Sequence, residues 1–322
     1  MRILSDAVIP SPLSAAARAG GVADLVEFRA LETRDVQLFA AFAGPEDGER
    51  VILLHGFPDC WLSWTHQLRA LAEAGYRVIA PDQRGYHLSD KPRDLQAYRL
   101  PALGGDIVDL LDAAGAERAH LVGHDWGGAV AWWLAKHRPD RLRSVTIANC
   151  PHPGVMLRHL SFRNPRQMLR SWYIGFFQLP LVPERALRFG NYRALEQTLR
   201  KLSATDHAFG DEELEAYKRA WSQPGALRAM LNWYRAGRLM IGSSTPDAAP
   251  RGAISVPVQL IWGTQDKALD ASLVEPSAAR CDDSRIVWLP EAGHWVHRDC
   301  PGEFNDALLD FLQAARNPAS VN

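Results

Sequence analysis

The chain has few cysteines, a net charge close to zero and no long apolar run, and each of these features excludes a class of protein. The 322 residues include four cysteines and no CxxC pair, so neither a disulfide framework nor a zinc site is predicted. The formal net charge of −1 attracts neither nucleic acid nor an anionic membrane surface. We therefore expect no metal site and no partner held by bulk charge. The cysteines are Cys60, Cys150, Cys281 and Cys300.

Targeting signals are missing as well. No run of residues is long and apolar enough to predict a transmembrane helix. The N-terminal segment lacks the apolar core of a signal peptide and is interrupted by Pro10 and Pro12. The expected location is the cytoplasm, a reducing compartment in which free cysteines are usual.

Hydrophobic residues, by contrast, make up 47% of the chain, which is enough to bury a sizeable core. Short apolar runs alternate with helical patterns, and this alternation predicts a mostly parallel sheet with helices on both faces. Sites in such sheets lie at the carboxyl ends of the strands. The expected strands are 25–31, 36–43, 51–54, 77–80, 119–122, 144–148, 257–262 and 285–289, and the expected helices include 61–74, 104–114 and 126–137.

The alternation stops after Asn149. Residues 150–250, called the helical block below, contain helical patterns rich in Arg, Leu, Trp and Tyr, and no convincing strand. The strand pattern resumes in VPVQLIW, at residues 256–262. We therefore predict a core formed by residues 1–149 and 251–322, with the helical block inserted as a cap and a pocket between the two.

A sharp strand-to-helix turn in this core carries a carboxylate. The sequence Gly123-His124-Asp125-Trp126-Gly127 has the small-x-nucleophile-x-small pattern of a nucleophile elbow, with Asp125 at the position of the nucleophile. Small residues are needed in this pattern because backbone segments approach closely at a strained turn. An aspartate before a helix is more often an ordinary N-cap, but the flanking glycines and the preceding strand favour the elbow.

Partners for Asp125 follow in the order nucleophile, acid, histidine, which is typical of α/β-hydrolases. Asp266 follows the expected strand 257–262, with Asp270 as its nearby rival. His294 follows the strand 285–289, with His297 as the alternative three residues later. Chain order and strand-end position favour Asp266 and His294 over an interpretation as solvated loop residues.

A third strand end carries the sequence HGFP, residues 55–58. The backbone N–H of Phe57, together with that of Trp126, can form an oxyanion hole. A cis Phe57–Pro58 peptide bond is a plausible means of aiming this N–H group. Without the elbow, HGFP would be interpreted as an ordinary turn at the end of a strand.

A carboxylate nucleophile changes the task of the histidine. A free aspartate has a pKa of about 4 and is already ionised at neutral pH, so it needs no base to activate it. Asp125 is expected to attack an electrophilic carbon and form an ester with the enzyme. His294, oriented by Asp266, then activates the water that hydrolyses this ester. Such a design suits displacement at a saturated carbon rather than hydrolysis of an ester or amide.

At this point the sequence resembles soluble-type epoxide hydrolases of the α/β-hydrolase superfamily. The resemblance runs through HGFPDCWLSW (55–64), APDQRGYHLSDKP (80–92), VGHDWGGAVAWW (122–133), ANCPHPGVM (148–156), NWYR (232–235), IWGTQD (261–266) and GHW (293–295). It implies an α/β-hydrolase fold, with a mostly parallel eight-stranded sheet, helices on both faces and an inserted helical cap. It also implies an enzyme without a cofactor that hydrolyses an epoxide to a vicinal diol.

The resemblance also implies two tyrosines as acids for ring opening, because an opening epoxide leaves as an alkoxide that gains from a proton. Tyr234 in NWYR is one of them, and Tyr173 in SWYIGFFQLP is the best match for the other. The alternative is that both are aromatic residues packed in the cap core, each with its O–H on a backbone carbonyl. The many aromatic residues of the cap suggest a small hydrophobic epoxide as substrate, with water as the second reactant.

Other functions remain open. A haloalkane dehalogenase would use the same triad and Trp126, but dehalogenases of this type resemble HGNP, and this chain has Phe57 in place of the asparagine. A ligand-binding scaffold without catalysis is a remote alternative, because all three triad positions are filled. His87 stands where the family most often has glycine, and Cys60 has no assigned role. The partners expected exclude nucleic acid and membranes, and a homodimer stays open.

Overall fold

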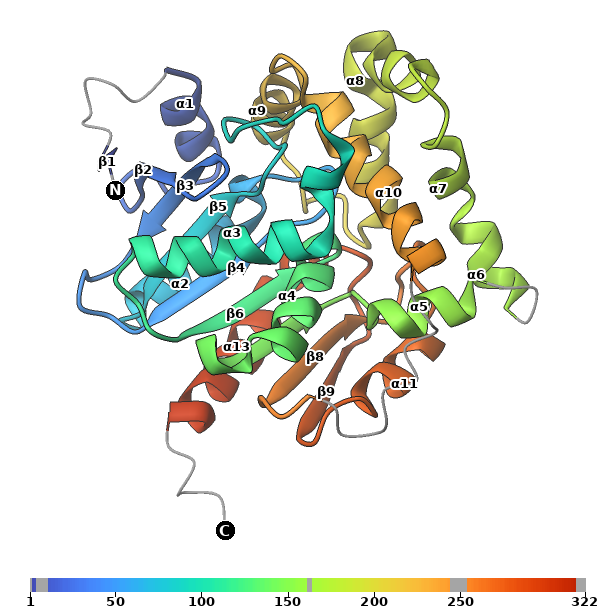
Figure 1. The fold of residues 1–322 in the computed structure, drawn as a ribbon. Helices are drawn as coiled ribbons and strands as arrows, with labels where there is room; N and C mark the ends of the chain where they lie inside the picture. The colour runs from blue at the N-terminus through green and yellow to red at the C-terminus, as the bar shows by residue number, and fades with distance from the viewer. Residues whose placement is uncertain (1, 4–10, 161–163, 244–253, 317–322) are drawn as a thin grey trace.

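Apolar runs buried on both sides form the centre of one twisted sheet (Figure 1). The computed structural model describes residues 2–3, 11–160, 164–243 and 254–316. Its strands are β1 (Arg2–Ile3), β2 (Glu27–Glu32), β3 (Gln37–Ala43), β4 (Arg50–Leu54), β5 (Arg77–Asp82), β6 (Ala119–His124), β7 (Leu142–Ala148), β8 (Val258–Gly263) and β9 (Ser284–Leu289). They lie side by side in the order β1-β2-β3-β5-β4-β6-β7-β8-β9.

The sheet is parallel from β5 to β9 and antiparallel at its N-terminal edge, where β1, β2, β3 and β5 pair. All eight strands expected from the sequence are present, with ends shifted by a few residues. The described chain adds a ninth strand, β1, which has two residues and pairs with β2. A run this short carries no alternation of apolar and polar residues, so the sequence pattern could not reveal it.

Helices cover both faces of the sheet. The helices α3 and α4 pack against each other on one face, in front of the sheet in Figure 1, and α2 and α13 pack together on the other face. The expected helix 61–74 is in fact a 3₁₀ turn at residues 61–64 followed by α2. The helices of the core are α1 (Ser11–Ala19), α2 (Thr65–Glu73), α3 (Leu100–Ala113), α4 (Trp126–His137), α11 (Val274–Ala278), α12 (Val296–Asp299) and α13 (Pro301–Arg316).

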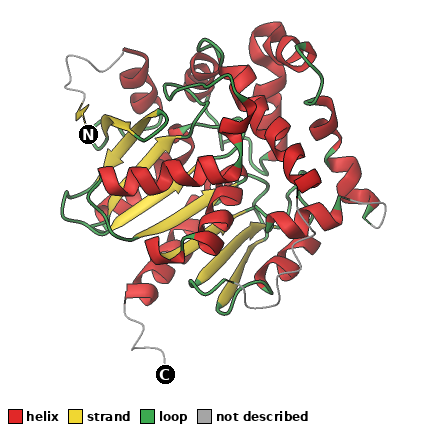
Figure 2. Cartoon of the chain, in the orientation of Figure 1, coloured by secondary structure: helices red, strands yellow, loops and turns green. Residues whose placement is uncertain are grey.

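Between β7 and β8 the described residues form helices and loops without a strand, as Figure 2 shows. These helices lie over the carboxyl ends of the central strands, at the upper right of Figure 1. The helices are α5 (Pro153–His159), α6 (Pro165–Arg170), α7 (Trp172–Phe176), α8 (Val182–Leu202), α9 (Asp211–Trp221) and α10 (Ala226–Ser243). The predicted boundary between residues 250 and 251 falls outside the described residues. Among the described helices, none is long and apolar enough to cross a membrane.

Buried polar contacts join the helical block to loops of the core. The indole N–H of Trp221 donates to the carbonyl of Pro58 at 2.6 Å, and that of Trp233 donates to the carbonyl of Arg84 at 2.9 Å. The guanidinium of Arg298, at the end of α12, pairs with Glu213 of α9 at 2.7 Å. Since both partners of this ion pair are buried, the contact is shielded from solvent.

Replacing Arg298 by methionine should therefore destabilise the protein strongly. The variant Arg298→Met leaves the carboxylate of Glu213 buried without its partner, which typically costs about 3–5 kcal/mol. The free energy of unfolding, measured by urea denaturation, checks this.

The matched control is Arg138→Met. Arg138 pairs with Asp140 at 2.9 Å at an exposed site, and the loss of such a pair should cost less than about 1 kcal/mol. Equal stabilities of the two variants would contradict the importance of the buried pair.

Candidate active site

The turn between β6 and α4 places Asp125 in a strained backbone conformation, with φ 49° and ψ −120°. A Cβ atom on Gly123 would lie 2.4 Å from the carbonyl oxygen of Gly127, and one on Gly127 would lie 2.2 Å from that of Leu54. Neither position has room for a side chain, so the glycines of the motif are required by close packing. The side chain of Asp125 makes no N-cap hydrogen bond to α4, which argues against the capping interpretation.

Backbone N–H groups hydrogen-bond this carboxylate. The N–H of Phe57 donates to Oδ1 of Asp125 at 2.9 Å, and the N–H of Trp126 also hydrogen-bonds the carboxylate. A Cβ on Gly56 would lie 2.4 Å from Cβ of Asp125, so the HGFP loop can approach this closely only with glycine there. The Phe57–Pro58 peptide bond is cis, as the sequence suggested. The two predicted oxyanion-hole donors therefore meet at Asp125.

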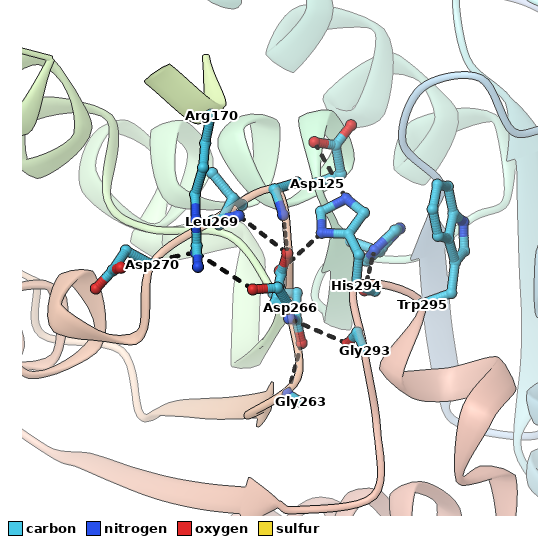
Figure 3. Close-up of polar contacts among 12 residues, drawn as sticks. Asp125, Arg170, Gly263, Asp266, Leu269, Asp270, Gly293, His294 and Trp295 are labelled. Carbon is cyan, nitrogen blue, oxygen red and sulfur yellow. Dashed lines mark hydrogen bonds and ion pairs between the residues drawn. The ribbon is translucent and has the colours of Figure 1, made fainter. Parts of the chain in front are cut away.

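His294 lies between two carboxylates, as Figure 3 shows. Its Nε2 is 3.8 Å from Oδ2 of Asp125, and its Nδ1 is 2.8 Å from Oδ2 of Asp266. The backbone N–H of His294 donates to the carbonyl of Leu202 at 2.9 Å, and its carbonyl is 2.9 Å from Nε2 of His124. These backbone contacts fix the loop that presents the imidazole.

Asp266 is itself fixed by three donors. The backbone N–H groups of Ala268 and Leu269 donate to Oδ1, and the side-chain amide of Asn149 donates to Oδ2 at 2.7 Å. The Oδ1 of Asn149 accepts from the N–H of Gly263 at 2.9 Å, so this side chain links the ends of β7 and β8. Asn149 was not among the site residues predicted from the sequence, although its place directly after a predicted strand was an available signal.

The two rivals named from the sequence lie elsewhere. Asp270 accepts a hydrogen bond from the N–H of Ser272 and lies 3.6 Å from Arg170. The imidazole of His297 is buried, with Nε2 2.9 Å from Oγ of Ser63 and its ring stacked on a tryptophan. Among the described residues, the histidine that faces both Asp125 and Asp266 is His294.

A cavity of about 340 Å³ opens in front of Asp125, and both predicted tyrosines line it. The rings of Tyr173 and Tyr234 meet edge to face, with centroids 5.8 Å apart. Tyr234 also packs edge to face against Phe57 and Trp126. Within the described ranges, neither tyrosine hydroxyl donates to a backbone carbonyl. The rest of the lining is mainly apolar and includes Leu100, Met156, Leu160, Ile174 and Leu269.

Comparison with known proteins agrees with this architecture. A family model for the alpha/beta hydrolase fold matches residues 49–299. The chain belongs to this family. An AB hydrolase superfamily protein of Bacillus subtilis, YfhM, is 42% identical over 290 residues, which cover 90% of this chain and 99% of that protein. Epoxide hydrolase 4 of Mus musculus is 36% identical over 276 residues, covering 84% of this chain and 75% of that protein.

Solved structures extend the similarity to three dimensions. Epoxide Hydrolase A from Mycobacterium thermoresistibile aligns with a TM-score of 0.78 at 32% identity, covering 89% of this chain and 98% of that one. An epoxide hydrolase from Bacillus megaterium, solved with an inhibitor, aligns with a TM-score of 0.80 at 27% identity, covering 88% and 100%. The predicted α/β-hydrolase fold and the resemblance to epoxide hydrolases are thus confirmed.

In this α/β hydrolase, the charges at the site depend on one another. Burial acts to lower the pKa of His294, but the charges of Asp266 and Asp125 and the hydrogen bond to Asp266 outweigh it and raise that pKa to about 9. Burial raises the pKa of Asp125. Burial also acts to raise the pKa of Asp266, but the charge and hydrogen bond of His294 and the amide of Asn149 hold it below its usual value. At neutral pH these shifts favour an imidazolium at His294 that is hydrogen-bonded to the carboxylate of Asp266.

Removing the charge of Asp125 should lower the pKa of His294. The variant Asp125→Asn keeps the shape of the side chain but loses one of the negative charges that favour the imidazolium, so the titration of His294 should move down from about 9. Imidazole resonances followed by NMR against pH give this pKa directly.

Asp270→Asn is the control, because Asp270 lies near the site without contacting the imidazole. It should leave the titration of His294 unchanged within about 0.3 units, which corresponds to about 0.4 kcal/mol. An unchanged titration in Asp125→Asn would contradict the coupling.

Proposed function

We propose that this α/β hydrolase converts an epoxide and water to a vicinal diol through an ester formed on Asp125. The observation that carries the proposal is that Asp125, Tyr173 and Tyr234 line the same cavity. A carboxylate can attack the epoxide carbon there while a neutral hydroxyl protonates the oxygen that leaves. Relatives named epoxide hydrolases, with which the chain aligns over most of its length, support the same activity.

In the first step, Oδ2 of Asp125 attacks the epoxide carbon while Oδ1 stays on the N–H of Phe57. The new bond joins Oδ2 to carbon, the carbon–oxygen bond of the ring breaks, and a tyrosine gives its proton to the released oxygen. Burial raises the pKa of both Tyr173 and Tyr234, so each is a neutral donor at pH 7. The resulting tyrosinate must recover a proton before the next turnover.

Esterification makes His294 available as a base. The ester of Asp125 carries no charge, so one of the charges that raise the pKa of His294 disappears and the imidazolium becomes more acidic. Its proton can then return to the tyrosinate. This exchange leaves neutral tyrosine and neutral imidazole, and the latter is the form needed for the second step.

In the second step, His294 takes a proton from water and the hydroxide adds to the ester carbonyl. The oxyanion forms at Oδ1, which accepts from the N–H of Phe57, and the N–H of Trp126 is the second donor to this carboxyl group. Collapse of this intermediate breaks the bond between Cγ of Asp125 and Oδ2. The released Oδ2, which is bonded to the substrate carbon, takes the proton from His294 and leaves as part of the diol. The regenerated carboxylic acid of Asp125 then gives its proton to His294, which restores the resting pair. Asp266 orients the imidazole throughout.

We further propose that the helical block acts as a cap on the core formed by residues 1–149 and 251–322. It supplies both tyrosines and much of the apolar lining, whereas Asp125 comes from the core. The small number of polar groups in the lining favours a hydrophobic epoxide. No step of this reaction calls for a cofactor, since the triad and the tyrosines supply every proton transfer.

Replacing His294 should trap the ester. His294→Gln keeps Asp125 and the tyrosines, so the epoxide should open once, but the base for hydrolysis is lost. After incubation with an aryl epoxide, intact-protein mass spectrometry should find one added substrate per chain, and digestion should locate it on the peptide that contains Asp125.

The control is His297→Gln, which changes the neighbouring histidine. It should turn over without accumulating an adduct, although loss of the contact to Ser63 should lower its stability. If His294→Gln opened the epoxide no faster than it released diol, the assignment of His294 to the second step would be wrong.

Replacing the tyrosines separates epoxide chemistry from halide chemistry. Each of Tyr173→Phe and Tyr234→Phe removes one donor and keeps the ring packing. Each should slow alkylation by an aryl epoxide about 10- to 100-fold, because the other tyrosine still donates. The double variant should lose far more. Stopped-flow measurement of the alkylation step gives these rates.

Tyr192→Phe is the matched control, because that tyrosine belongs to the helical block and packs on Trp221 outside the cavity. It should alkylate at the wild-type rate. A double variant that opened epoxides as fast as the wild type, or a wild type that released halide from haloalkanes faster than it formed diol, would favour the dehalogenase alternative.

A further inference from the structure

Two residues to which sequence analysis gave no role, Cys60 and His87, meet in the structure. Cys60 ends the loop that follows β4, and His87 lies in the loop that follows β5, whose last residue is Asp82. One ligand atom from each of Cys60, Asp82 and His87 lies within 4.8 Å of the others. All three side chains are at least nine-tenths buried, with relative exposures of 3%, 0% and 6%. Buried groups of this kind are normally paired with each other or bound to a metal ion.

The carboxylate of Asp82 is oriented toward His87. Its Oδ1 accepts from the backbone N–H of Trp61 at 3.0 Å, which leaves Oδ2 facing Nδ1 of His87 at 2.9 Å. The backbone carbonyl of Asp82 accepts from the hydroxyl of Ser89. Such contacts around a donor group fix its direction, and metal ligands typically have them.

His87 occupies a backbone conformation that glycine would adopt at lower cost. Its φ is 39°, which lies in the left-handed region that few residues other than glycine favour. A strained residue persists where its surroundings hold it in place, and such residues gather at functional sites. The imidazole of His87 points inward to Asp82 rather than to solvent, so the strain accompanies a buried polar contact.

The donor set suits one kind of ion. A thiolate, an imidazole and a carboxylate together are typical ligands of Zn²⁺ and of related transition-metal ions, whereas Mg²⁺ and Ca²⁺ prefer oxygen alone. Bond lengths of about 2.0–2.3 Å place tetrahedral ligand atoms roughly 3.3–3.8 Å apart. The widest separation in the cluster would therefore shrink by about 1 Å, and the contact between Asp82 and His87, now 2.9 Å, would widen by about 0.4 Å. Thiolate and carboxylate together contribute two negative charges, which balance a divalent ion. The ammonium group of Lys91 donates to the carbonyls of His87 and Ser89. Its positive charge lies near the cluster and opposes binding of a metal ion.

We propose that Cys60, Asp82 and His87 bind one divalent transition-metal ion of the Zn²⁺ type, with water as the fourth ligand. Binding displaces the proton of the Cys60 thiol and forms a metal–sulfur bond. Where Nδ1 of His87 is the ligand atom, its proton moves to Nε2 of the same ring, so one proton is released in all and no electron is transferred.

The ion would connect the HGFP loop, which supplies one of the oxyanion-hole donors, to the loop that follows β5. Cys60 lies three residues after Phe57, whose N–H donates to Asp125, and Asp82 and His87 belong to the neighbouring loop. A metal at this position would hold the HGFP loop in place without touching the substrate. This inference does not rest on the proposed epoxide chemistry, because it concerns a separate cluster with a separate ligand.

The test is metal binding by the untagged full chain after treatment with a chelator. Titration with ZnCl₂, followed by calorimetry and by elemental analysis after gel filtration, should give one ion per chain and a rise in melting temperature. Substitution with Co²⁺ should give a near-ultraviolet thiolate-to-cobalt charge-transfer band. These readouts are independent of enzymatic activity.

Three variants decide the outcome. His87→Gly removes a ligand and places at φ 39° the residue that best tolerates it, so it should fold. It and Cys60→Ser should each weaken Zn²⁺ binding by more than about 100-fold, since loss of even an outer partner costs 10- to 100-fold. Cys60→Ser should also lose the charge-transfer band. Cys300→Ser, at another buried free cysteine, should bind as the wild type does.

A wild type that binds no Zn²⁺ would overturn the proposal, and so would binding that survives in either ligand variant. In both cases the cluster would be a hydrogen-bonded brace between the loops. If His87→Gly failed to fold, the comparison of Cys60→Ser with Cys300→Ser would still give the answer.

Discussion

The close approach of three backbone segments around Asp125 is the constraint on which the site depends. The strand β6 turns into α4 at this residue, and the HGFP loop passes so near that Gly56, Gly123 and Gly127 have no room for a Cβ. The strain of the turn is held by packing on all sides. Its result is that one oxygen of the carboxylate accepts from the backbone N–H of Phe57 and the other faces His294. A looser turn would give up both contacts at once.

Electrostatic coupling depends on the same geometry. His294 and Asp266 are buried, and Asp125 lies partly buried beside them, so the charge on one of these three groups affects the proton affinity of the others. Esterification removes the negative charge of Asp125, and the pKa of His294 falls as a result. The order of the two chemical steps is thereby linked to the protonation state of one imidazole.

Much of the fold could be predicted because its signals are local. Buried strands appear as apolar runs, and chain order with strand-end position was enough to expect that Asp125, Asp266 and His294 would meet. The two-residue strand β1 has no such pattern. Asn149 reads as a turn residue, and only the arrangement of β7 beside β8 shows that its amide reaches Asp266. Cys60 and His87 meet through the packing of two loops, and their spacing along the chain matches no ligand pattern.

The indole contacts of Trp221 and Trp233 bear on how molecules enter and leave. Each connects the helical block to a core loop through a buried hydrogen bond, and the pair Arg298–Glu213 adds a third connection. Lifting the whole block away from the core would break all three buried contacts together. Exchange of bound molecules is therefore expected to proceed by local motions of the residues that line the cavity, while the helical block stays attached to the core.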